Sequence, residues 1–245
     1  MRIGHSRYLL PKNQMSRDKI PEGFYWSPSR HALAKSCQSC FIRKYVYEQP
    51  YDQEYNKAFD YGHKVHDMAE GKDRGAIEEK MVKDGWTLDE LNMLQEHVEL
   101  YDKYAKKLKF SDVDISEHEA VGNIEGLPIP FYGILDRLLV KDKQVYGFVE
   151  IKTSAQPWSQ TRIETDDQLT WYWTWYRYTY GDEPKAFLLD FVKNKEKPTA
   201  ICKRIRRTDE DCTRLIAEAK DLHERYVENV KDVEPVCKRT FFCPY

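Results

Sequence analysis

Two acidic residues and a lysine in the middle of the chain could together hydrolyse a phosphate ester. Asp136 lies before a short polar connection, and Glu150 and Lys152 follow it. Because side chains alternate along a strand, Glu150 and Lys152 share one face, and Asp136 can join them across a hairpin. Carboxylate oxygens favour Mg²⁺ or Mn²⁺, which would activate a water and neutralise charge on the phosphate. The lysine would hold that water or contact the phosphate. Taken alone, the three residues could also be solvated charges on an amphipathic strand pair.

Two predicted helices add polar side chains that could complete this site. One contains Gly62-His63-Lys64-Val65-His66, from which an imidazole could join a metal shell. The residues alone leave His63 and His66 as alternative ligands. The other contains Gln168 and Tyr172, which lie on one helix face because they are four positions apart.

The segments around these residues predict an α/β fold. Residues 131–140 and 145–153 are rich in β-branched and aromatic side chains and read as a hairpin closed at residues 141–144. We expect a further strand near residues 113–115, strands at 185–193 and 199–206, and helices at 27–47, 54–80, 87–109, 166–180 and 208–230. This order predicts a mixed central sheet flanked by helices, with a helical lobe in front.

The motifs, taken in order, resemble the PD-(D/E)XK nuclease superfamily. Within it they look like the RecB-like branch, which includes CRISPR-adaptation nucleases and many phage exonucleases. The opening Ser27-Pro28-Ser29-Arg30, followed by a cysteine, also looks like the start of that branch, and Leu135 replaces the proline that is usual there. The resemblance covers about residues 27–193. The matching positions are Gly62, His66, Gly133, Asp136, Glu150, Ile151, Lys152, Gln168 and Tyr172.

The resemblance implies a metal site and a set of roles for its neighbours. His66, Asp136, Glu150 and the backbone carbonyl of Ile151 would hold Mg²⁺ or Mn²⁺, so the family motif favours His66 over His63. The resemblance also implies that Lys152 is the catalytic lysine. Gln168 and Tyr172 would brace the site and touch the DNA strand.

The function implied is metal-dependent hydrolysis of DNA. We expect an exonuclease that prefers single-stranded DNA or DNA ends and uses a metal-activated water. Two alternatives stay open: a CRISPR-adaptation-type nuclease working in an integration complex, and an inactive DNA-binding protein on the same scaffold. The protein could also form a homo-oligomer or join a DNA-processing complex.

Four cysteines near the two ends of the chain are candidate ligands for a second metal group. Some RecB-like nucleases join their termini with a four-cysteine iron–sulfur cluster, and Cys237 and Cys243 have the spacing of its last pair. The remaining cysteine is expected at position 234, which is Glu234. Either Cys37 and Cys40 both ligate, giving a two-plus-two iron–sulfur or zinc site, or there is no cluster.

Aromatic and basic runs give weaker signals. The aromatic helix over residues 171–180 is expected in the core, because a helix that is apolar all round is buried. Trp158, in the preceding loop, is the better candidate for stacking on an unpaired base. The basic run at 203–207 could follow phosphates or protect an edge strand by its charge.

Composition and length exclude several classes of protein. Lys and Arg number 39 against 41 Asp and Glu, so the formal net charge is −2 and a globally basic nucleic-acid coat is ruled out. No apolar stretch approaches the roughly 20 residues that span a bilayer. The first residues lack the apolar region of a secretory signal. We therefore expect a cytoplasmic protein without a membrane partner, in a bacterial, archaeal or phage-infected cell.

The chain of 245 residues is predicted to form a single nuclease domain. Its expected parts are an N-terminal arm, a helical lobe, an α/β catalytic core, and a C-terminal helix with a cysteine-containing tail, over residues 1–26, 27–110, 111–206 and 207–245.

Overall fold

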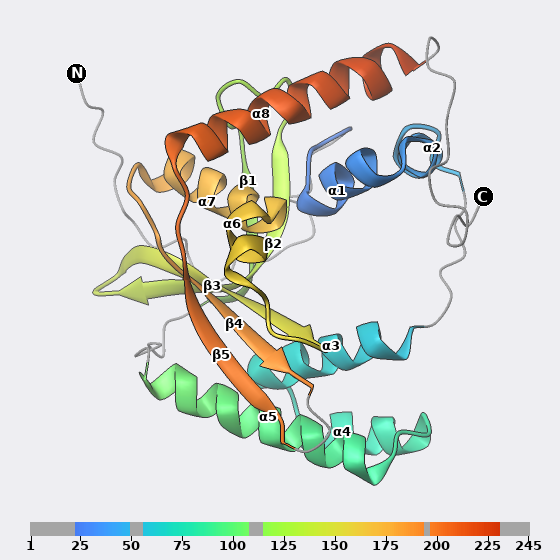
Figure 1. Cartoon of the computed structure of the whole chain (residues 1–245), viewed down its shortest axis with the longest axis vertical. Helices are drawn as coiled ribbons and strands as arrows, with labels where there is room; N and C mark the ends of the chain where they lie inside the picture. The colour runs from blue at the N-terminus through green and yellow to red at the C-terminus, as the bar shows by residue number, and fades with distance from the viewer. Residues whose placement is uncertain (1–22, 50–55, 108–114, 194–196, 231–245) are drawn as a thin grey trace.

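A five-stranded mixed sheet lies between two groups of helices (Figure 1). The computed structural model describes residues 23–49, 56–107, 115–193 and 197–230. The strands are β1 Ile115–Gly122, β2 Phe131–Lys141, β3 Gln144–Ser154, β4 Lys185–Val192 and β5 Thr199–Ile205. They follow one another in chain order across the sheet, with β3 and β4 parallel and the other neighbours antiparallel. The predicted α/β class with a mixed central sheet is confirmed.

Strands β2 and β3 form a tight hairpin that opens at its far end. Asp142 and Lys143 have φ values of 51° and 62°, as a two-residue hairpin turn of the primed type requires. The backbone pairing runs from the turn to Arg137 opposite Val149 and goes no further. Beyond that pair β2 stays with β1 and β3 stays with β4. The sheet therefore has a notch between β2 and β3.

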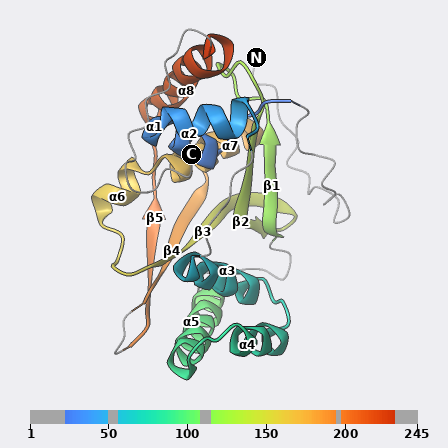
Figure 2. The same ribbon diagram turned by 90° about the vertical axis from the view of Figure 1, so that its right-hand side faces the viewer.

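One group of helices packs around an aromatic helix on one face of the sheet (Figure 2). It consists of α1 Pro28–Ser36, α2 Gln38–Phe41, α6 Gln160–Thr165, α7 Asp167–Tyr180 and α8 Asp209–His223, with π-helical segments Ile42–Val46 and Glu224–Glu228. The α7 aromatics from Trp171 to Tyr176 are buried as predicted, whereas Tyr178 is 43% exposed and Tyr180 is partly buried. The Trp171 ring stacks on Phe131 with centroids 5.2 Å apart. Helix α7 ends at Gly181, whose φ of 79° is the left-handed conformation typical of a glycine cap.

The second group covers the other face with α3 Lys57–Ala69, α4 Arg74–Lys83 and α5 Leu88–Lys107. Its core includes Tyr61, Val65 and Leu94 from the helices and Val149 and Ile151 from β3. The helices expected as one lobe over residues 27–110 thus divide between the two faces. Among the described residues, no helix combines the length and apolarity needed to cross a membrane.

Two predicted helices are interrupted, and one helix was not predicted. The prediction of a single helix over residues 54–80 was wrong. Gly71, with a φ of 81°, lies in the turn that separates α3 from α4. The helix expected over residues 27–47 breaks at Cys37, which has an extended backbone. Helix α5 confirms its prediction, and Thr87 and Glu90 form a capping box at its start. Helix α6 had no clear signal.

Candidate active site

The predicted site residues meet at the notch between β2 and β3. The His66 Nδ1 atom, on α3, lies 3.2 Å from Oδ1 of Asp136 on β2. The other oxygen of Asp136 accepts a hydrogen bond of 2.6 Å from the backbone N–H of Ile151. Because the strands have separated here, a side chain from α3 on one face and side chains from α7 on the other can reach the same place.

Glu150 has one oxygen fully engaged and the other without a donor. Its Oε1 accepts hydrogen bonds from Lys152 Nζ at 2.6 Å and from Gln168 Nε2 at 2.7 Å. Lys152 also donates to Gln168 Oε1 at 2.9 Å, so the three side chains lock one another. The Glu150 side chain is 1% exposed, and its Oε2 atom has no hydrogen-bond partner among the described residues. A buried carboxylate oxygen without a donor is costly, unless a cation completes it.

Tyr172 braces the end of β2 from α7. Its hydroxyl donates a hydrogen bond of 2.6 Å to the carbonyl of Ile134 and lies 3.4 Å from Gln168 Nε2. Gly133 makes room for this ring, since a Cβ atom there would lie 2.8 Å from Tyr172 Cε1. At Gly62 a Cβ atom would lie 3.0 Å from Thr153 Oγ1, so this glycine lets α3 approach the end of β3.

Burial and neighbouring charges shift the pKa values of the site residues. Burial raises the pKa of Glu150 to about 8, and the nearby charge of Asp136 adds to the shift. Burial alone would raise the pKa of Asp136, but His66 and Lys152 outweigh it and lower the pKa. Burial disfavours the charged form of Lys152, yet Glu150 and Asp136 raise its pKa overall. Ionisation of Glu150 beside Asp136 is therefore favoured by positive charge close by, from Lys152, from a protonated His66 or from a bound cation.

The donor set at the notch fits a hard divalent cation. It offers carboxylate oxygens, of which Glu150 Oε2 accepts no hydrogen bond from the described part of the chain, and an imidazole close to Asp136. The structure also separates the two candidate histidines. His66 contacts Asp136, whereas the ring of His63 packs on Phe59 with centroids 4.4 Å apart. The metal-binding and catalytic roles of the site residues stay predictions.

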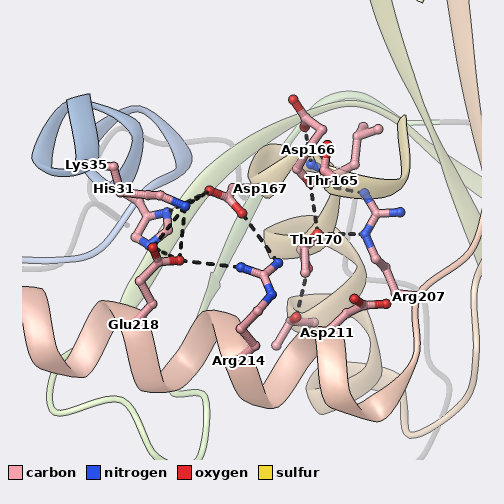
Figure 3. Close-up of polar contacts among 12 residues, drawn as sticks. His31, Lys35, Thr165, Asp166, Asp167, Thr170, Arg207, Asp211, Arg214 and Glu218 are labelled. Atoms are coloured by element: carbon pink, nitrogen blue, oxygen red, sulfur yellow. Dashed lines mark hydrogen bonds and ion pairs between the residues drawn. The ribbon is translucent and has the colours of Figure 1, made fainter. Parts of the chain in front are cut away.

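A second, more compact group of charged side chains joins α1, α7 and α8 (Figure 3). The group contains three residues of types that can bind a metal ion, His31, Asp167 and Glu218, and their nitrogen and oxygen ligand atoms all lie within 4.8 Å of one another. No other group of three His, Cys, Asp or Glu side chains in the described part of the chain meets this limit. The Lys35 ammonium lies 2.7 Å from Asp167 Oδ2 and 3.0 Å from Glu218 Oε1. Arg214 lies 3.5 Å from Glu218. Lys35 thus takes the position of a cation between the carboxylates, and the cluster joins three helices next to Gln168.

Arg207, two residues beyond the end of β5, fixes the start of α7. Its guanidinium donates to Thr170 Oγ1 at 2.6 Å and to the carbonyls of Ile163 and Asp166 at 2.6 and 3.0 Å (Figure 3). Arg207 is buried, so this member of the basic run neither follows phosphates nor guards an edge. Neither the Lys35 cluster nor Arg207 had a sequence signal, because both depend on contacts between segments far apart in the chain.

The structure describes only the N-terminal pair of the predicted cysteine ligands. Cys37 and Cys40 are buried, and their sulfur atoms lie 2.8 Å apart. That is too long for a disulfide bond, which measures about 2.05 Å. Cys237 and Cys243 lie outside the described residues. The iron–sulfur or zinc site therefore stays a prediction.

Comparisons with known proteins agree with this geometry. A family model described as the PD-(D/E)XK nuclease superfamily matches residues 25–245. The chain belongs to this superfamily. Members of the PD-(D/E)XK superfamily generally use divalent metals, which is consistent with the donor set at the notch.

Among solved structures, this PD-(D/E)XK protein is similar to a crystal structure of a "putative exonuclease" from Eubacterium rectale. The TM-score is 0.66 and the identity 15%, over 98% of this chain and 93% of the other, which shows the shared fold. A structure of a protein designated SSO0001 matches with a TM-score of 0.42 and 13% identity, over 93% of this chain and 85% of the other. No curated protein matches the chain.

Proposed function

We propose that this nuclease is a divalent-metal-dependent deoxyribonuclease that hydrolyses phosphodiester bonds, acting as an exonuclease on single-stranded DNA or DNA ends. The observation that carries the proposal is the state of Glu150. One of its oxygens is held by Lys152 and Gln168, while the other is buried without a donor beside Asp136 and His66. Such an arrangement fits a site that binds a cation and presents it to a phosphate.

The proposed ligands are two carboxylates, an imidazole and a backbone carbonyl. Asp136, Glu150, His66 and the carbonyl of Ile151 would hold Mg²⁺ or Mn²⁺. A cation bound there supplies an activated water and stabilises negative charge on the phosphate. The Ile151 N–H holds Asp136 in place through its 2.6 Å hydrogen bond, so the carboxylate is oriented before any metal arrives.

The remaining side chains position the proposed ligands or donate hydrogen bonds to the substrate. Lys152 has its ammonium held by Glu150 and Gln168, and its third N–H is the proposed donor to the attacking water or the phosphate. Gln168 fixes the rotamers of both partners. Tyr172 holds β2 at Ile134, which keeps Asp136 at the correct distance from β3. No covalent intermediate with the protein is required.

The choice of DNA and of exonuclease action rests on the resemblance of the motifs to RecB-like nucleases. The structural neighbour from Eubacterium rectale carries the description of an exonuclease, which agrees with this choice. A negatively charged substrate also suits a site in which a lysine and a bound cation surround the scissile phosphate.

The test uses single- and double-stranded DNA labelled at either the 5′ or the 3′ end, with Mg²⁺ or Mn²⁺, beside a matched RNA strand. We expect shortening of DNA from an end, loss of activity in EDTA, and no cleavage by Glu150→Gln. Binding of DNA without cleavage in any divalent metal would instead favour an inactive DNA-binding protein. Preferential cleavage of the RNA strand would contradict the assigned substrate.

A further inference from the structure

The first turns of α3 carry an exposed aromatic pair. The Phe59 side chain is 57% exposed, and the exposed His63 ring packs on it with a centroid distance of 4.4 Å and an interplanar angle of 69°. The opposite side of the same helix is buried through Tyr61, Val65 and Met68. Because exposed aromatic surface is costly in water, a ligand that covers Phe59 gains burial free energy.

This pair lies on the helix face that leads to the active site. Phe59, His63 and His66 are spaced as i, i+4 and i+7, so they follow one another along a single face. The rise of about 1.5 Å per residue places Phe59 about 10 Å from His66 along the helix axis. That length corresponds to about three nucleotides at the ~3.4 Å rise of stacked bases. A strand with its phosphate at the active site can therefore place a nearby base on Phe59.

The same end of α3 has a positive charge beside it. Lys193, at the end of β4, lies 3.4 Å from the carbonyl of Ala58 and 3.9 Å above the Tyr61 ring. The N-terminus of a helix adds a partial positive charge. Lys193 thus lies at the same end of α3 as Phe59, but it covers the Tyr61 side of the helix, and Asp60 adds a carboxylate to the first turn.

We propose that Phe59 and His63 form a stacking platform for a nucleobase of the substrate strand, one to three nucleotides from the scissile phosphate. The inference rests on the nuclease activity proposed above and adds the binding site of a flanking nucleotide. Stacking on an aromatic ring does not depend on base identity and requires an unpaired base, so the platform selects single-stranded nucleic acid. Trp158, the stacking candidate from sequence, is only 6% exposed, and Arg162 covers its ring at 3.8 Å.

The binding arm of the test does not require catalysis. Fluorescence anisotropy with a labelled single strand in EDTA compares the wild type with Phe59→Ala, Phe59→Trp and Val82→Ala. Val82, on α4, is 60% exposed and serves as the matched control for loss of an exposed apolar side chain. We expect Phe59→Ala to weaken binding by roughly five- to 100-fold, the range of one base–aromatic stack. Phe59→Trp and Val82→Ala should bind as the wild type does.

The cleavage arm locates the base. Strands with one abasic site are cut in Mn²⁺, and each product is read at single-nucleotide resolution. In the wild type, cleavage should slow at the bond lying one to three nucleotides from the abasic site. Phe59→Ala should lose this position dependence, because without the Phe59 ring the removal of a base no longer removes a stacking contact.

Three results would overturn the platform: equal binding by Phe59→Ala and Val82→Ala, an abasic pattern that Phe59→Ala does not change, or a dimer that Phe59→Ala dissociates without weakening DNA binding. A wild-type protein that binds the strand but cleaves nothing would refute the nuclease activity, while the anisotropy arm still decides the stacking site. A wild-type protein that binds no DNA would refute both.

Discussion

The carboxylate of Asp136 accepts a 2.6 Å hydrogen bond from the backbone N–H of Ile151, just beyond the last backbone pair of β2 and β3. The Asp136 side chain thus continues the hydrogen bonding between β2 and β3 beyond the point where their backbone pairing ends. This contact fixes the carboxylate at the mouth of the notch and orients it toward His66. It also ties the geometry of the candidate site to the way the sheet opens.

Removing any one of the three central charged groups should abolish cleavage. We expect Asp136→Asn, Glu150→Gln and Lys152→Met each to lower the rate by at least ~10²–10³, because each removes a positioned charge from a buried site. The measurement is the initial rate on end-labelled DNA in Mg²⁺ and in Mn²⁺. Glu79→Gln is the control, since this carboxylate is exposed on α4. Normal cleavage by all three variants would refute the assignment.

Metal binding should release protons and strengthen as the pH rises. The pKa of Glu150 is raised to about 8, chiefly by burial, so this group is largely protonated at pH 7 without a cation. Burial lowers the pKa of His66, but Asp136 more than compensates and raises it overall. Both groups must lose their protons to become ligands. Calorimetric titration with Mn²⁺ between pH 6 and pH 9 should show increasing affinity.

Titrations in buffers of different ionisation enthalpy count the protons released. Glu150→Gln should release fewer protons than the wild type and show a shallower rise in affinity with pH. An affinity that is independent of pH would show that these groups are not the ligands.

Stability should fall as the pH drops from about 6.5 to about 4, partly through His97. This buried imidazole lies 2.8 Å from the Tyr61 hydroxyl and 3.3 Å from the Val192 carbonyl, and burial lowers its pKa to about 4. In the unfolded chain its pKa is about 6.5, so the unfolded state binds the extra proton in this window. At about 1.4 kcal/mol per pKa unit, the loss is at most about 3.5 kcal/mol.

Urea unfolding at pH 7.5, 6 and 5 measures this contribution. His97→Gln lacks the titrating group, so its free energy of unfolding should decline less over the same range than that of the wild type. Parallel pH profiles for the two proteins would show that His97 does not contribute.

Removing Lys35 should destabilise the protein more at pH 7.5 than at pH 5. Lys35→Met leaves Asp167 and Glu218 without the ammonium that separates them, at a cost of about 1 kcal/mol for a half-exposed cluster. Burial lowers the pKa of His31 to about 4, and Lys35 contributes to the lowering. Without Lys35 the imidazole protonates more readily and partly replaces the lost charge. Urea unfolding at both pH values checks this.

The double variant Lys35→Met/Glu218→Gln is the control for charge repulsion. It should regain part of the lost stability at pH 7.5, because one of the two carboxylates is gone. A double variant that is less stable than Lys35→Met would mean that repulsion is not the cause.

The two buried N-terminal cysteines should bind metal together with Cys237 and Cys243. Protein purified without oxygen should contain iron and absorb near 400 nm, or contain zinc, and Cys37→Ser/Cys40→Ser should lose the metal. Cys202→Ser is the control, since Cys202 is not among the predicted ligands. Elemental analysis that finds neither iron nor zinc in the wild type would eliminate both forms of the site.

Local patterns were sufficient wherever the answer depended on the period of a strand or helix. Alternation put Glu150 and Lys152 on one face, and helical spacing aligned Gln168 with Tyr172. The helix predicted over residues 166–180 likewise matches α7 to within one residue. The sequence showed that the motif contains Gly62 and Gly133, but it did not show why glycine is needed at these positions. The structure shows why they are small, since Gly133 accommodates the Tyr172 ring.

Long-range packing decided what the local patterns left open. A helix carrying both His63 and His66 follows from the sequence, but only the position of α3 against the notch brings His66 to Asp136 and leaves His63 with Phe59. The burial of Trp158 and Arg207 likewise depends on partners far away in the chain. The sequence by itself determined which side chains could do the chemistry. The tertiary structure decided which of them meet, because burial and distance are set by segments that no local pattern links.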